Sequence, residues 1–317
     1  MYKGFNMTFK PSLKYALATL LIGTTAMHAD NAETAYRNLI GKSVFTSNNQ
    51  FLQTGWYDYD RTANGSEPEL TNANFVGSYY FGNKGDTWRP FIQGGFGFSQ
   101  IEQDAVSFDN GGTGSIDLDS TYWKVGGGIN FNPNQDLAFV VGASALWMNT
   151  DSGNFYAFTP VQTRTNTLFN TESDTTLYDV YGSVVFHPTI SGYNTHFEAT
   201  MHYISIDYDH GISDVDGYNA DLKAGFHTHQ LTTFLELPVW AEFYVGAVLL
   251  DDDLSEINGF DSALSAGSSL HWKVGPMIHL FDDAFKDTDI SLNLQGTTSN
   301  TDFQGWKVSA SFNIVKF

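Results

Sequence analysis

Histidines are concentrated in two stretches of the chain, one holding His196 and His202 and the other His227 and His229. Imidazole nitrogen is a good ligand for Zn²⁺, Cu²⁺ and Ni²⁺. Side chains two residues apart on a strand point to the same side, so a strand through 227–229 would offer a metal ion two ligands. The alternative is that these histidines lie near a strand end and bind nothing. The sequence leaves a metal site open, and we expect no cofactor.

Acidic residues crowd two further segments that could bind a harder cation. They are Asp207, Asp209, Asp214, Asp216 and Asp221 in the first segment and Asp251, Asp252, Asp253 and Glu256 in the second. Carboxylates at this density can bind Ca²⁺, but neither segment has the spacing of an EF-hand loop. Acidic loops more often simply stay hydrated. The candidate metal ligands are therefore His227, His229, Asp251, Asp252 and Asp253.

Nucleophilic catalysis on a lipid would need a serine activated by a histidine, with a third group that orients the base. The chain has neither a Gly-x-Ser-x-Gly motif nor a His-x-Ser-Asn-Gly motif. Its nine histidines need no catalytic explanation in a chain of 317 residues. We therefore expect a non-enzymatic protein, with a lipid-modifying hydrolase left as an alternative.

Charged side chains also lie within segments that alternate apolar and polar residues. In 136–149 every second residue from Leu137 to Trp147 is apolar, and this period of two indicates a strand with one apolar face. In a soluble sandwich that face would be the core, whereas in a membrane barrel it faces lipid and the polar lane lines the lumen. Charges of both signs on the polar lane favour the barrel. The predicted lumen-facing charged residues are Arg89, Lys124, Asp179, Glu198, Glu242, Lys273 and Lys307.

The composition favours strands and excludes one class of partner. Charged residues make up 16 % of the chain, against about 25 % in soluble domains, while aromatic residues reach 15 %. The formal net charge of −20 argues against nucleic acid, because phosphate contacts need lysine and arginine. There is no cysteine, so stability must come from closure of the fold or from its surroundings.

Twelve candidate strands alternate between short turns and long polar links. We expect them at 51–60, 72–82, 87–101, 119–132, 136–149, 175–187, 194–208, 224–237, 239–250, 264–280, 288–298 and 303–317. The long links are 61–71, 102–118, 150–174, 209–223 and 251–263. Short turns on one side and long loops on the other are typical of an all-β, transmembrane, antiparallel up-and-down β-barrel. If the strands flanking Pro238 were merged or split, the count would be about ten or fourteen.

The first 29 residues have the layout of a secretory signal peptide. Three lysines precede an apolar run at 15–23 that is too short to cross a bilayer as a helix, and Ala26 or Ala29 offers a cleavage position. We therefore expect 1–29 to be a cleaved signal peptide, 30–50 a short N-terminal segment, and 51–317 the barrel.

Two glycine- and aromatic-rich segments, 88–98 (WRPFIQGGFGF) and 122–129 (YWKVGGGI), lie in a predicted barrel of about 265 residues that starts at Phe51. Together with the twelve strands, they make the chain resemble the translocator barrels of autotransporters. Only about 20 residues separate the signal peptide from the first strand, too few for a secreted passenger domain. The resemblance is therefore to solitary autotransporter-like barrels without a passenger.

The resemblance also gives the segment 30–50 a role, because in that family a helix at this position threads the pore. Tyr36, Leu39, Ile40 and Val44 recur at helical spacing and are the expected plug residues. Gly41 weakens the helix prediction. The alternative is a short periplasmic helix or a frayed arm.

The expected function is that of a narrow or plugged pore, or of a surface-exposed structural protein, in the outer membrane of a Gram-negative bacterium. The alternative is a surface ligand-binding or adhesin barrel that acts through its long extracellular loops. Expected partners are outer-membrane lipid, lipopolysaccharide, and the barrel assembly machinery, which would recognise the C-terminal Phe317. The solute, the loop ligand and the oligomeric state do not follow from the sequence.

Overall fold

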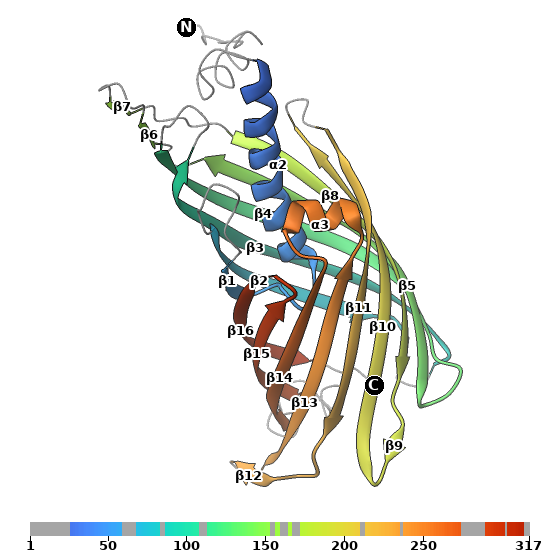
Figure 1. The fold of residues 1–317 in the computed structure, drawn as a ribbon. Helices are drawn as coiled ribbons and strands as arrows, with labels where there is room; N and C mark the ends of the chain where they lie inside the picture. Colours follow the sequence, from blue (N-terminus) through green and yellow to red (C-terminus); the bar gives the residue numbers. More distant parts are fainter. Residues whose placement is uncertain are drawn as a thin grey trace, which may run out of the picture.

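The computed structural model describes residues 26–58, 68–82, 86–107, 113–152, 156–158, 164–166, 172–209, 213–234, 237–273, 289–301 and 303–313. Within these ranges, twelve strands form one closed antiparallel barrel with a helix inside it (Figure 1). The predicted all-β barrel of twelve strands with an N-terminal helix is confirmed.

The ring strands pair with their neighbours in chain order, and β1 pairs with β16 to close the ring. They are β1 (Gly55–Asp58), β2 (Pro68–Tyr80), β3 (Trp88–Ser107), β4 (Thr113–Phe131), β5 (Leu137–Ser152), β8 (Glu172–Phe186), β10 (Tyr193–Tyr208), β11 (Val215–His227), β13 (Leu237–Leu250), β14 (Ser262–Lys273), β15 (Asp289–Ser299) and β16 (Gln304–Asn313). Four short strands extend this ring, namely β6 (Tyr156–Phe158), β7 (Arg164–Asn166), β9 (Thr189–Ile190) and β12 (Thr232–Phe234).

Two helices accompany the strands. Helix α2 (Ala26–Asn48) leads into the barrel, and helix α3 (Asp252–Asn258) lies in the link between β13 and β14. Asp251 caps α3 by accepting a hydrogen bond from the Leu254 amide, and Gly259 ends it at φ 77°, a left-handed conformation that suits glycine. Among the described residues, no helix is long and apolar enough to cross a lipid bilayer.

The strands place apolar side chains outside and polar ones inside. Trp123 and Val141 on the outer face are 67 % and 64 % exposed, whereas their inward neighbours Tyr122 and Gly142 are buried. A soluble barrel or sandwich would bury its apolar lane instead. This inverted distribution suits a barrel whose outer wall is solvated by lipid.

One predicted strand begins too late. Residues 209–223 were expected to be a loop followed by a strand at 224–237, but β11 already starts at Val215 and ends at His227, and residues 228–231 separate it from β12. The segment is rich in Asp and Asn because its polar residues, such as Asn219 and Asp221, line the lumen. Pro238 lies within β13 opposite Thr233 of β12 rather than in a turn.

Other boundaries also shift. The first strand begins at Gly55 rather than at 51, and the predicted long loop 251–263 holds α3. Several predictions lie outside the described residues, namely the signal peptide up to residue 25, the strand portion at 274–280, and Phe317.

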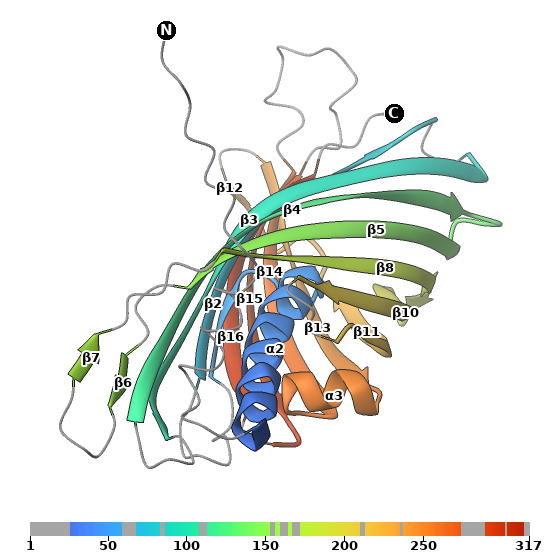
Figure 2. The same cartoon turned by 90° about the horizontal axis from the view of Figure 1, so that it is seen from above.

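The largest buried apolar cluster lies inside the barrel, around α2. Leu39, Ile40, Val44 and Phe45 of the helix pack against the inward faces of the strands and against α3. Figure 2 shows α2 within the arc of the strands, with α3 beside it. The position that a water-filled lumen would take is thus occupied by a helix.

Candidate functional site

The N-terminal helix fills the half of the lumen where α3 lies. Of the predicted plug residues, Leu39, Ile40 and Val44 are 5 %, 1 % and 0 % exposed. The side chain of Tyr36 lies outside the described part of the chain. The helix enters beside α3 and runs towards the opposite end of the barrel (Figure 1).

A close contact between helices holds this end of the plug. At Gly41, a Cβ atom would lie 2.5 Å from Ile257 Cγ2 and 2.6 Å from the Tyr208 hydroxyl, so only glycine lets α3 approach this closely. The residue that weakens the helix prediction is therefore the contact point for α3. Two residues further along the helix, Ser43 Oγ donates a hydrogen bond to Ser99 Oγ of β3 at 2.7 Å.

Lys42 is the buried cation of the plug. Its Nζ donates to the Ile257 carbonyl of α3 at 2.6 Å, and burial lowers the pKa of Lys42 to about 8. Arg37 makes a more exposed ion pair with Glu256 of α3 at 3.1 Å. A lysine that is buried at a helix–helix contact is tolerated only because its remaining protons find oxygen acceptors or are released.

Two amides anchor the far end of the helix. Asn48 donates to Asp179 Oδ2 at 3.0 Å, and Asn49 donates to both carboxylate oxygens of Asp221 at 3.2 Å. His202 lies between the two acids, with Nδ1 2.9 Å from Asp179 Oδ1 and Nε2 3.7 Å from Asp221 Oδ2. Both carboxylates are almost fully buried, so these hydrogen bonds offset a large desolvation cost.

The chain that follows the helix is also anchored to the wall. Lys307 Nζ donates to the Gln50 carbonyl and Gln295 Nε2 donates to the Phe51 carbonyl, each at 2.8 Å. These bonds satisfy backbone carbonyls of the turn that follows the helix. The plug is therefore held by side chains of β8, β11, β15 and β16, on several sides of the barrel.

A polar cavity of about 440 Å³ lies beyond the anchored end. Asn48 and Gln50 of the plug line it together with Lys124 of β4 and Glu198 of β10. We call this cavity the vestibule. Asn48 and Gln50 form its boundary with the plug, so the lumen has a polar pocket on one side and an apolar helix contact on the other.

The structure places six of the seven predicted lumenal charges on the inner face. Asp179, Glu242 and Lys307 are buried, and Arg89, Lys124 and Glu198 are partly buried. The side chain of Lys273 lies outside the described part. Asn48, Asn49 and the anchoring role of Asp221 were not predicted from the sequence. The available signal was a pair of asparagines at the end of a predicted helix.

The predicted metal ligands are not brought together as a set. His227 ends β11 and points inward, whereas His229 lies in the following turn, exposed, with its ring 4.9 Å from that of Tyr193. The two therefore do not share a strand face. Asp251 caps α3, and Asp252 and Asp253 lie exposed in its first turn. His227 instead joins His196 and Glu242, whose possible ligand atoms lie within 4.8 Å of one another.

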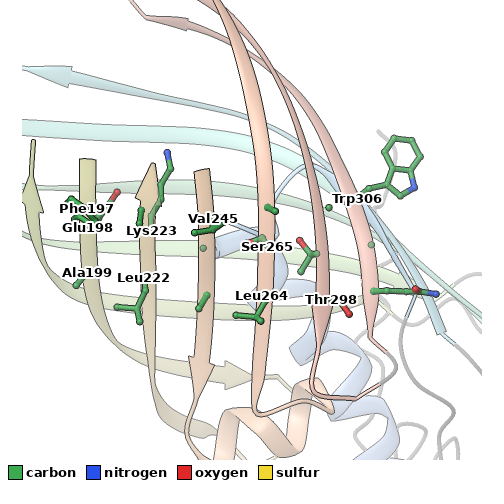
Figure 3. A pocket seen from close by; sticks show the side chains of 18 of the residues that line it. Phe197, Glu198, Ala199, Leu222, Lys223, Val245, Leu264, Ser265, Thr298 and Trp306 are labelled. Atoms are coloured by element: carbon green, nitrogen blue, oxygen red, sulfur yellow. The ribbon is translucent and has the colours of Figure 1, made fainter. Parts of the chain in front are cut away.

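The outer wall carries a wide, shallow apolar groove of about 1190 Å³. Figure 3 shows Leu222, Val245 and Leu264 along it, with Trp306 at one side. Its floor is lined by small residues of successive strands, including Ala199, Ala224, Ala247 and Ala266. These alanines lie on the same outward lane of the strands as Leu222 and Leu264.

Comparison with known proteins finds a match in the fold alone. No family model matches the chain, and no curated protein matches it significantly. The β domain of the Bordetella autotransporter BrkA is similar, with a TM-score of 0.53 at 8 % identity over 82 % of this chain and 96 % of that one. The translocator domain of the autotransporter NalP from Neisseria meningitidis has a TM-score of 0.51 at 9 % identity over 82 % and 84 %. The chain thus has the fold of an autotransporter translocator domain.

Proposed function

We propose that this chain is a non-enzymatic, autotransporter-like β-barrel of the Gram-negative outer membrane whose own N-terminal helix keeps the pore plugged. The observation that carries the proposal is the burial of α2 inside the ring, with Val44 and Phe45 both at 0 % exposure. A helix held at this position by α3 and by the strand anchors would block an aqueous path past these residues.

The outer wall supports the membrane location. Large apolar side chains such as Phe75, Trp123 and Leu264 are each more than 60 % exposed there. Exposing such a surface to water would be unfavourable by about 25 cal/mol per Å² of apolar area. Lipid and the acyl chains of lipopolysaccharide are the proposed environment of this face.

The vestibule supports a pore-like rather than a solid barrel. It retains charges of both signs, Lys124 and Glu198 among them, so an opened lumen would select weakly between anions and cations. The proposal therefore predicts closure by the plug and low selectivity once the plug is removed.

Planar-bilayer recording of the refolded protein tests this function. We expect the intact chain to be silent and a variant that lacks 30–50 to conduct with weak ion selectivity. A matched control keeps the helix but carries the substitution Asp216→Asn on the outer side of β11, and it should stay silent. Steady conductance by the intact protein would contradict a plug. Silence of both the intact and the truncated protein would remove the pore role and leave a structural one.

A further inference from the structure

Four neighbouring strands each contribute one inward-facing side chain to a cluster at the end of the barrel where β12 lies. They are His196 of β10, His227 of β11, Glu242 of β13 and His271 of β14. His227 and Glu242 are direct cross-strand partners. We call these four residues the histidine cluster. The contacts of this cluster join residues of the strands.

The contacts converge on the Glu242 carboxylate. His196 Nε2 lies 3.3 Å from Oε1, and His271 Nε2 lies 3.4 Å from Oε2. The ring of His227 is 5.7 Å from that of His196 and 5.9 Å from that of His271, measured between centroids. The side chains of His196 and Glu242 are 6 % and 10 % exposed, so the cluster is largely shielded from bulk water.

His196 is held in place but not satisfied. Both of its ring nitrogens are buried without a hydrogen-bond partner. At Gly225, opposite His196 in the sheet, a Cβ atom would lie 2.4 Å from His196 Cε1, so the glycine makes room for the imidazole. Native proteins rarely leave buried polar atoms unpaired, and such atoms often mark the site of a ligand that supplies the missing bond.

We propose that the histidine cluster binds one divalent transition-metal ion, with His196, His227 and Glu242 as its protein ligands. Two imidazoles on one tetrahedral Zn²⁺ have ring centroids about 5 Å apart and ligand atoms about 3.3 Å apart. The observed 5.7 Å between rings, and ligand atoms within 4.8 Å of one another, need only small side-chain rotations to reach that geometry.

The ligand types select the class of ion. Two imidazoles and one carboxylate favour Zn²⁺, Cu²⁺, Ni²⁺ or Fe²⁺, whereas Ca²⁺ and Mg²⁺ take oxygen ligands almost exclusively. His271 is placed to orient the second carboxylate oxygen of Glu242, with its ring stacked on Trp240 at 5.4 Å. Groups of this kind fix the geometry of metal ligands in many sites.

Lys223 is the competing cation. Its Nζ donates to Glu242 Oε1 at 2.9 Å and lies over the Tyr244 ring at 4.5 Å. A bound metal ion would share the carboxylate with this ammonium or displace it. The proposal therefore makes a specific prediction, that Lys223→Met increases metal affinity because it removes a positive charge from the site.

The test is isothermal titration of the tag-free, chelator-treated full chain in detergent with ZnCl₂, with MgCl₂ as the reference ion. We expect one Zn²⁺ per chain and no Mg²⁺ signal. His196→Ala and His227→Ala should each weaken Zn²⁺ binding by more than about tenfold. The exposed His229→Ala is the matched control and should leave it unchanged.

Two further readouts keep the test independent of folding defects. Glu242→Gln keeps the side-chain shape, so we expect the variant to fold. On unheated gels it should migrate like the folded parent barrel. Its Zn²⁺ binding should nevertheless fall. Electron paramagnetic resonance of the Cu²⁺ form should show nitrogen splitting from two imidazoles, reduced to one in His227→Ala. Absence of stoichiometric Zn²⁺ binding, or binding unaffected by His196→Ala and His227→Ala, would overturn the proposal.

Discussion

Two groups of histidine and carboxylate side chains lie on the same inner wall and have different partners. Where the plug ends, the Asp179 and Asp221 carboxylates accept hydrogen bonds from the helix amides and flank His202. Nearer the other end of β10, the ring nitrogens of His196 lack hydrogen-bond partners beside Glu242. The residue types are the same, but the N-terminal segment reaches only the first group.

The difference shows what makes a buried polar group an anchor or a binding site. Buried carboxylates need hydrogen-bond donors, and the chain supplies them at the first group by bringing Asn48 and Asn49 to it. At the histidine cluster, the contacts within the described part of the chain come from the strands, and both ring nitrogens of His196 are left for the proposed metal ion.

The largest effect is expected at the fully buried anchor. Asp221→Leu removes the carboxylate that accepts hydrogen bonds from the side-chain amides of Asn49 and Asn219. Both amides then lose this acceptor. We expect the free energy of unfolding to fall by about 3–5 kcal/mol, because a buried network is broken by the loss of one partner. Guanidinium unfolding in detergent measures this. The exposed Asp216→Leu on the same strand should change it by less than about 0.5 kcal/mol, and an equal loss in both variants would contradict the anchor role.

Raising the pH should increase the free energy of unfolding, because Lys42 loses its proton more easily in the folded protein than in the unfolded chain. Its pKa is about 8 in the folded protein, against about 10.4 in the unfolded chain. Between these values the unfolded state binds the extra proton, so stability rises with pH, by up to about 3 kcal/mol. Unfolding at pH 7.5 and pH 10 measures the rise, and Lys42→Met should remove that part of it. The same pH dependence in Lys42→Met would show that other groups cause it.

A smaller effect is expected where α3 meets the plug. Gly41→Leu should cost about 1–3 kcal/mol because the new side chain meets Ile257 and Tyr208. Ile257→Ala makes room, so the double variant should lose less stability than the sum of the two single variants. Differential scanning calorimetry and bilayer recording of the three variants follow stability and leak together. Strict additivity would mean that the two helices do not touch in solution.

The smallest effect is expected at the outer ion pair. Arg37→Ala removes the bond to Glu256, whose side chain is 63 % exposed. Exposed ion pairs of this kind contribute about 0.5 kcal/mol or less to the free energy of unfolding. The variant should unfold like the parent protein and stay closed in the bilayer. A clear leak would show that this surface ion pair, and not the buried anchors, keeps the pore closed.

The sequence was sufficient to predict the ring of strands but not the anchors. Apolar residues on the lipid side, such as Trp123 and Val141, follow a strict period of two, which is a local signal. The first part of β11, from Val215 to residue 223, was missed because its inward Asn219 and Asp221 resemble an acidic loop when their partners are unknown. Those partners are distant in sequence, as Asn49 and Asp221 are 172 residues apart.

The same limit applies to the histidine cluster. His227 was identified as a candidate ligand but was paired with His229, because spacing along one strand was the only available evidence. Glu242 joins His227 through the register of β11 against β13, and His196 joins through β10. The register between two strands depends on the whole sheet and cannot be predicted from either segment alone.

The most direct test of the plugged lumen uses the absence of native cysteine. Ser43 Oγ of the helix and Ser99 Oγ of β3 are 2.7 Å apart, so Ser43→Cys combined with Ser99→Cys should form a disulfide in the folded barrel. We predict complete cross-linking on mild oxidation, followed by a barrel that stays closed in the planar bilayer. A folded barrel that does not cross-link, or that conducts while cross-linked, would contradict a helix plug.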